Sequence, residues 1–213
     1  MISLDEKVKN LLHDFYDYDS NTFEHSVKVA IYANLTAQVL GITDSDLEEL
    51  TLAALLHDIG KMAIPYHVLT KPGKLSSIEF SKIKIHTTMS SLILEELGAS
   101  DAIKLGVLWH HENADGSGYP CGFTNDSIND IARIIHVCDV YDAMLSKRIY
   151  KDTMPENEVF DHLINNAGNI FDKKVLTAFI HALCLYETHN LEVKNELLTT
   201  FIADFMHHIG YQA

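Results

Sequence analysis

The pair His57-Asp58 follows directly after a strongly apolar helical run at residues 52–56. Burying an ionisable pair of this kind is costly unless another charge compensates it, and a metal ion is the natural compensation. Adjacent helical side chains diverge by about 100°, so His57 and Asp58 cannot bind one ion from the same face. They suit the junction of a two-metal site, where the imidazole holds one ion and the carboxylate bridges both. We expect Gly60 to end the helix and Lys61 to place an ammonium group near the metals, where it can meet a phosphate.

Other ligand-type side chains lie at intervals on both sides of this pair. His25 lies 32 residues before His57, and Asp139 lies 28 residues after His111. All of them fall on predicted helices, and none is a thiolate. The full set of candidates, five histidines and two aspartates, consists of His25, His57, Asp58, His86, His110, His111 and Asp139.

Apolar periodicity predicts helices along the whole chain and therefore an all-α fold. Residues 102–109 are apolar on nearly every face, which favours a central buried helix that delivers His110-His111 at its C-terminal end. At residues 86–97 we expect a core-facing stripe of Met89, Leu92, Ile93 and Leu97. A capping box at Ser76 and Glu79 starts one further helix, and Thr43 and Asp172 are expected to cap two others. The remaining helices are expected at residues 1–19, 23–40, 43–58, 131–145, 155–165, 172–183 and 191–207.

Composition restricts the class of protein. The 213 residues suit one domain, and 47% hydrophobic with 22% charged residues is ordinary for a globular chain. No apolar run reaches the roughly 20 residues of a membrane span, and the N-terminus lacks a signal-peptide core, so we expect a cytoplasmic protein without a membrane contact. A net charge of -14 argues against a nucleic-acid polymer as partner, although local basic groups still permit a small anionic substrate. Three cysteines at unpaired spacing predict free thiols.

Two motifs together resemble a known family. They are His57-Asp58-Ile59-Gly60-Lys61 and the segment at residues 110–120, which reads His-His-Glu-Asn-Ala-Asp-Gly-Ser-Gly-Tyr-Pro. Both are similar to the motifs of the HD-GYP branch of the HD-domain metal-dependent phosphohydrolases. The resemblance covers about residues 23–176. It implies an HD-domain helical bundle that hydrolyses cyclic di-GMP, or in some members another cyclic dinucleotide.

The resemblance also implies a set of metal ligands. One ion is expected to bind His25, His57, Asp58 and Asp139, and the other Asp58, His86, His110 and His111. Mixed imidazole and carboxylate ligands suit iron or manganese. A hydroxide shared between the two ions would attack phosphorus, with Asp58 and Lys61 as the catalytic side chains. Family members with a third metal carry a glutamate where this chain has Asn21, so we expect two ions.

Substrate contacts are expected from Lys61, Tyr119, Asp142, Arg148 and Lys151. Arg148 suits a bidentate phosphate contact. The family pattern around it reads Asp-Arg-Pro-Tyr, whereas this chain has Lys147 and Ile149 in place of the aspartate and proline. That departure weakens the inference about substrate more than the inference about metals.

The expected organisation has three parts, an N-terminal helical segment at residues 1–20, the catalytic domain at 21–187 and an additional C-terminal helix at 188–213. The Gly118-Tyr119-Pro120 loop is implicated in the family in contacts with diguanylate cyclases, and the C-terminal helix is a candidate seam for a homodimer. Three alternatives stay open at this point. They are a hydrolase of another cyclic dinucleotide such as cyclic GMP-AMP, a non-catalytic docking protein that binds cyclic dinucleotides, and a purely structural bundle.

Overall fold

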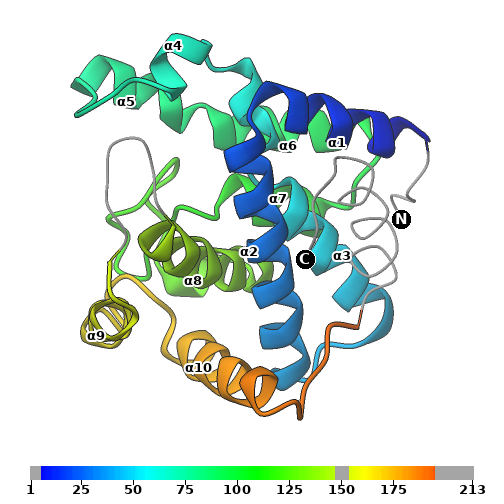
Figure 1. Cartoon of the computed structure of the whole chain (residues 1–213), viewed down its shortest axis with the longest axis vertical. Helices are drawn as coiled ribbons and strands as arrows, with labels where there is room; N and C mark the ends of the chain where they lie inside the picture. Colours follow the sequence, from blue (N-terminus) through cyan, green and yellow to red (C-terminus); the bar gives the residue numbers. More distant parts are fainter. Residues whose placement is uncertain (1–5, 147–153, 195–213) are drawn as a thin grey trace.

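The all-α prediction is confirmed by the computed structural model in Figure 1, which describes residues 6–146 and 154–194. Within these ranges, the extended pairing amounts to two isolated bridges, Asp115 with Thr124 and Ala167 with Phe171. The helices are α1 (Glu6–Tyr18), α2 (Ser20–Val39), α3 (Asp44–Leu56), η1 (Ile59–Ala63), α4 (Tyr66–Leu69), α5 (Ser77–Lys84), α6 (His86–Glu96), α7 (Asp101–Leu108), η2 (Asn125–Ser127), α8 (Asp130–Leu145), α9 (Glu156–Asn165) and α10 (Lys173–Glu187).

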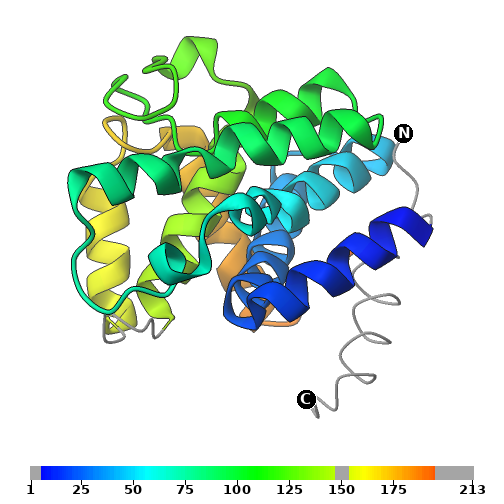
Figure 2. The same cartoon turned by 90° about the horizontal axis from the view of Figure 1, so that it is seen from above.

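Helix α2 is the centre of the bundle, with α1, α3, α8 and α10 packed against it (Figures 1 and 2). More than half of its residues are buried, including Phe23, Val29 and Leu35. The expectation that residues 102–109 form the central helix is wrong. Helix α7 buries only Ile103, Gly106 and Val107, because one face packs on α6 and α8 while the other faces solvent.

Side-chain caps fix several helix starts. Asp19 accepts a hydrogen bond from the Asn21 backbone at the start of α2, and Asp172 accepts one from Val175 at the start of α10. The capping box of Ser76 and Glu79 is confirmed at α5. Thr43 occupies the N-cap position of α3 without capping it, because its hydroxyl bonds the Asp44 carboxylate instead.

Gly60 does not end α3 as expected, because the helix stops at Leu56 and the chain continues as η1. A Cβ at Gly60 would lie 2.2 Å from the carbonyl oxygen of His86 and 2.5 Å from the backbone nitrogen of Ser90. The glycine therefore permits close contact between η1 and α6. The Gly60 N–H also donates to the Ser90 hydroxyl at 2.8 Å.

That contact determines which face of α6 is buried. The buried residues are His86, Thr87, Ser90 and Leu94, so the predicted stripe of Met89, Leu92, Ile93 and Leu97 is confirmed only in part. Ile93 and Leu97 are partly buried and pack against the core. Leu92 is 47% exposed. Close approach of two backbones requires small residues, so Ser90 occupies the contact with Gly60 and Leu92 lies outside the core.

Beyond α10 the chain returns along α2. The buried Asn34 side chain bonds both the backbone N–H and the carbonyl of Lys194, at 3.1 and 3.2 Å, and Gln38 donates to the Glu192 carbonyl. Residues 191–194 are not helical, so the predicted helix at 191–207 does not begin at its expected first residue. Residues 195–207 lie outside the described part of the chain.

The three cysteines, Cys121, Cys138 and Cys184, are free thiols as predicted. Across the described residues, no helix combines the length and apolar character that crossing a bilayer requires.

Candidate metal centre

Five separate parts of the fold bring ligand-type side chains to one place. Helix α2 carries His25, the end of α3 carries His57 and Asp58, α6 begins with His86, and α8 carries Asp139, while His110-His111 follow α7. Three overlapping groups have ligand atoms within 4.8 Å of one another: His86, His110 and His111; His25, His57 and Asp58; and His57, His110 and Asp139. The structure thus brings together all seven side chains that the sequence singled out, and a divalent metal ion can be held among them. Their individual roles as ligands stay a prediction.

Helix ends orient three of these imidazoles. His57, His86 and His110 each lie one or two residues beyond a helix, and each Nδ1 lies 2.6 to 2.7 Å from the carbonyl oxygen three residues earlier. Carbonyls in the last turn of a helix have no partner within the helix, so they are ready acceptors. The carbonyl can only accept, and Nδ1 therefore carries the proton. This fixes the tautomer in which Nε2 presents a lone pair, as a metal ligand requires.

Those lone pairs face one another and a carboxylate. The Nε2 atoms of His86 and His110 are 3.3 Å apart, and His86 Nε2 lies 3.2 Å from Asp58 Oδ1. Neither contact can contain a proton when both imidazoles are protonated at Nδ1 and neutral. His57 Nε2 and Asp58 Oδ1 are buried without a hydrogen-bond partner. Acceptors that converge in this way are unfavourable unless a cation lies among them, so the residues present fit a metal ion.

Burial and charge give these groups the protonation states that metal ligands need. Burial lowers the pKa of His86 and of His110 to about 4, which keeps both imidazoles neutral at pH 7. Burial alone would raise the pKa of Asp58, but Lys61, His57 and His86 outweigh it and hold that pKa well below its ordinary value. Asp58 is therefore ionised. It lies within 4.0 Å of three imidazoles, those of His25, His57 and His86.

His25 is held differently, between two carboxylates of α8. Its Nδ1 lies 2.6 Å from Asp142 Oδ2 and its Nε2 lies 2.9 Å from Asp139 Oδ1. Burial lowers the pKa of His25, but the hydrogen bonds to Asp139 and Asp142 outweigh it and leave that pKa raised. Ser146 also donates to Asp142 Oδ2, which is otherwise shielded from solvent. Asp142 is thus placed to orient His25.

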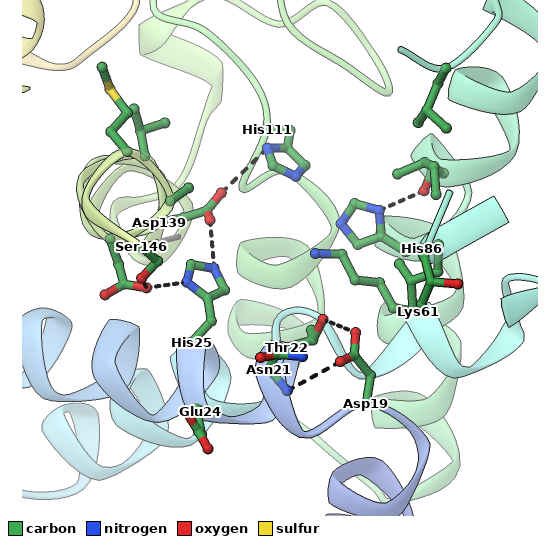
Figure 3. Close-up of a pocket in the computed structure, with 18 of the residues that line it drawn as sticks. Asp19, Asn21, Thr22, Glu24, His25, Lys61, His86, His111, Asp139 and Ser146 are labelled. Atoms are coloured by element: carbon green, nitrogen blue, oxygen red, sulfur yellow. Dashed lines mark hydrogen bonds and ion pairs between the residues drawn. The ribbon is translucent and has the colours of Figure 1, made fainter. Parts of the chain in front are cut away.

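The geometry bears on how ligands divide between two ions. The groups around Asp58 and around His86 each contain three of the four members of a predicted set, whereas the group of His57, His110 and Asp139 takes residues from both sets. The division of ligands between two ions stays a prediction. Asn21, which replaces the glutamate of three-metal relatives, lies at the rim beside Asp19, whose carboxylate accepts its backbone N–H. In Figure 3, Glu24 points away from His25, His86 and Asp139.

The ligand cluster opens into a large cavity of about 1220 Å³. Its lining includes the start of α2, the loop at residues 70–75, α5 and the C-terminal half of α8. The Lys61 ammonium lies 2.5 Å from Asp58 Oδ2, and in Figure 3 it points into the space between His25, His86 and His111. It balances the Asp58 charge and offers its other N–H groups to a ligand in the cavity.

The loop after His111 is fixed by Glu112. This buried carboxylate accepts the backbone N–H groups of Cys121, Gly122 and Phe123 at 2.6, 3.1 and 3.0 Å. A Cβ at Gly118 would lie within 2.5 Å of three backbone atoms of residues 111–113, so only glycine fits there. These contacts hold the loop in one conformation beside His111.

Tyr119 from this loop packs against a candidate ligand. Its ring lies 4.7 Å from the His111 ring, centroid to centroid, and the Lys84 ammonium lies 4.6 Å from the ring centroid. The Tyr119 side chain also lines the cavity. It thus supports His111 and borders the space expected for substrate.

Further side chains lie beside the centre or border the cavity. His136 bonds the His110 carbonyl through Nδ1, and Arg133 lies 3.3 and 3.9 Å from Asp130 and Asp172, so both side chains have structural partners. Sequence reasoning missed Phe80, which lines the cavity, and Lys84, whose ammonium lies over the Phe80 ring. An exposed aromatic residue four positions before a lysine on one helix was the available signal. The expected substrate contacts Arg148 and Lys151 lie outside the described residues.

Comparisons with known proteins identify the family of the chain. A family model described as HD domain matches residues 10–175. The chain is 40% identical over 169 residues to a cyclic di-GMP phosphodiesterase of Pseudomonas aeruginosa, covering 79% of this chain and 41% of that protein. It is 37% identical over 164 residues to a 3'3'-cGAMP-specific phosphodiesterase of Vibrio cholerae, covering 77% of this chain and 36% of that protein. The chain therefore spans well under half the length of these two relatives.

Among solved structures, an HDG"Y"P protein of Bdellovibrio bacteriovorus has the same fold, with a TM-score of 0.62 at 21% identity. The alignment covers 76% of this chain and 52% of that one. The family match, the relatives and the two motifs lead to one conclusion: the chain belongs to the HD-domain family, in its HD-GYP branch.

Proposed function

We propose that this chain is a metal-dependent phosphodiesterase that hydrolyses cyclic di-GMP to the linear dinucleotide, and further to GMP where the product is cut again. One observation carries the proposal, the convergence of five imidazoles and two carboxylates beneath a cavity that also receives the Lys61 ammonium. The relatives named as cyclic di-GMP phosphodiesterases support this choice of substrate.

We propose that His25, His57, Asp58, His86, His110, His111 and Asp139 hold two divalent ions, iron or manganese. When bound, such ions supply Lewis acidity and lower the pKa of a water so that it can attack phosphorus near neutral pH. Asp58 would join the two halves of the centre, because imidazoles from both halves surround its oxygens. Asp142 would hold His25 in position through Nδ1.

The other side chains would act on the substrate. Lys61 would donate to the phosphoryl oxygens, where negative charge grows in the transition state. Tyr119 borders the cavity, and its pKa is raised by burial and by the charges of Asp139 and Asp58, so its hydroxyl would act as a neutral hydrogen-bonding group. Arg148 and Lys151 remain proposed contacts for the second phosphate, on the basis of the family motif.

The test is turnover by protein purified without oxygen and analysed for its metals. Asp58→Ala and His110→Ala should each reduce kcat at least about 100-fold, because even the outer partners of metal ligands cost 10- to 100-fold. His181→Ala is the matched control, since His181 is an exposed histidine on α10. Circular dichroism checks that each variant folds. Near wild-type turnover in either site variant would refute the mechanism.

Mixed cyclic GMP-AMP is the second candidate substrate, favoured by the likeness to the Vibrio cholerae enzyme. Parallel assays with both dinucleotides at equal concentration separate the two. Tight binding of cyclic di-GMP without turnover in metal-loaded protein would instead favour a docking protein. A contact with a diguanylate cyclase through Gly118-Tyr119-Pro120 and a homodimer are further proposals, which co-purification with a cyclase and sedimentation of the purified chain would test.

A further inference from the structure

One wall of the cavity has no part in the proposed metal chemistry. It consists of α4, the loop at residues 70–75 and α5. Of the described residues of α5, Phe80 and Ile83 line the cavity and Ile78 does not. The Phe80 side chain is 46% exposed. Phenylalanine normally buries most of its surface, so a ring left this exposed on the wall of a cavity is unusual.

Contacts hold this ring in position without covering it. The Phe80 and Tyr119 rings meet edge to face, with centroids 6.5 Å apart and planes at 78°. The Lys84 ammonium lies 5.0 Å from the Phe80 centroid and 4.6 Å from the Tyr119 centroid. Cation–π contacts of this kind fix both rings relative to the lysine. Phe80 is thus a positioned aromatic surface that faces an open space.

The charges around the same cavity indicate the chemistry of its ligand. Lys61, Lys71 and Lys74 line it, although the whole chain carries a net charge of -14. Lys71 forms an ion pair with Glu79, and Lys61 forms one with Asp58 while its other N–H groups can donate to a ligand in the cavity. Cations beside an exposed aromatic ring suit a ligand with both phosphates and flat bases. The cavity volume of about 1220 Å³ exceeds the range of about 300–1,000 Å³ typical of small-molecule sites.

We propose that Phe80 stacks against a nucleobase of the bound cyclic dinucleotide, so that α5 recognises the base while α2, α3 and α8 act on the phosphate. The inference rests on the proposed function and deepens it by naming a residue that selects the substrate class. A base has an aromatic face whatever its identity, and stacking on a protein ring is worth about 5- to 150-fold in affinity.

The first experiment compares steady-state kinetics on cyclic di-GMP. Phe80→Ala should raise KM about 5- to 150-fold, while Phe80→Trp should keep KM within about threefold of wild type, because its ring still offers a stacking face. Ile78→Ala is the matched control, since Ile78 lies on the same helix, is 72% exposed and does not line the cavity. Because both positions are exposed, neither substitution should disturb the fold, and circular dichroism checks this.

The second experiment reads stacking without turnover. Phe80→Trp places an indole at the proposed contact, and stacking of a guanine should quench its fluorescence as cyclic di-GMP is added. Ile78→Trp should show no such quenching. The wild-type chain has a single tryptophan, so its titration gives the background.

The outcomes separate this inference from the proposed function. If wild type hydrolyses cyclic di-GMP, but Phe80→Ala leaves KM unchanged and Phe80→Trp is not quenched, the stacking inference fails alone. If metal-loaded wild type does not hydrolyse cyclic di-GMP, the proposed function fails. Quenching in Phe80→Trp would then still establish the base contact in a binding protein.

Discussion

Replacing Gly60 with alanine tests how tightly the metal centre depends on the contact between η1 and α6. The added Cβ would lie 2.2 Å from the His86 carbonyl oxygen, whereas ordinary contacts begin at 3.4 Å. The two segments must therefore separate by about 1.2 Å, the difference between these distances. This would displace His86 from Asp58 and stretch the hydrogen bond from Gly60 to Ser90.

The cost can be worked out from these contacts. Overpacking of a close interface costs about 1–3 kcal/mol, and loss of one buried hydrogen bond adds about 1 kcal/mol. We expect Gly60→Ala to lower the free energy of unfolding by about 2–4 kcal/mol. A displacement near 1 Å at a catalytic centre can also reduce kcat by about 100-fold.

Urea unfolding of metal-free protein and turnover of the metal-loaded form measure both effects. Gly73→Ala is the control, because Gly73 has a φ of +91° with open space around it and reports the cost of backbone conformation alone. Adding Ser90→Gly should not rescue Gly60→Ala, since the two shortest contacts are to backbone atoms. A loss below about 1 kcal/mol in Gly60→Ala would show that the two segments separate freely, and the reasoning would be wrong.

Two further predictions concern pH and the loop. In metal-free protein, the free energy of unfolding should fall as the pH drops from about 6.5 to about 4. Burial lowers the pKa of His86 and His110 in the folded protein to about 4. Between these pH values the unfolded chain therefore binds protons that the folded chain does not. His25, whose pKa is raised in the folded protein, opposes this trend in part. Urea unfolding across this pH range in the presence of a chelator measures the net change in the free energy of unfolding. A constant free energy of unfolding would contradict the prediction. Glu112→Ala should lower the free energy of unfolding by about 2–4 kcal/mol, because three backbone N–H groups lose their acceptor. As a control, Glu48→Ala on the exposed face of α3 should lower it by less than about 0.5 kcal/mol.

Sequence reasoning succeeded where the signal was local. Capping by Asp172 and by the Ser76 box depends on residues three apart, and the structure has both. The candidate ligands converge because each stands at a fixed place relative to a helix, as His57 does at the end of α3.

Errors arose where packing between distant segments decided the outcome. Apolar content predicted a central helix at residues 102–109, yet Leu105 of α7 is 36% exposed. The apolar stripe of α6 was only partly correct, because close approach to Gly60 favours Ser90 over a larger side chain. Neither effect is visible in the periodicity of one helix, because each depends on which partner lies against it.

Main-chain carbonyls, rather than acidic side chains, steer three of the imidazoles of the metal centre. The Nδ1 atoms of His57, His86 and His110 donate to the carbonyl oxygens of Ala54, Ile83 and Val107. A carbonyl is common to every residue type, so substitution at those three positions leaves the acceptor in place as long as the helices end where they do. Substitutions around the cavity can therefore change which ligands enter it while the orientation of these three rings stays the same. His25, which relies on the carboxylate of Asp142, and His111, whose Nδ1 faces the carboxylate of Asp139, lack that protection.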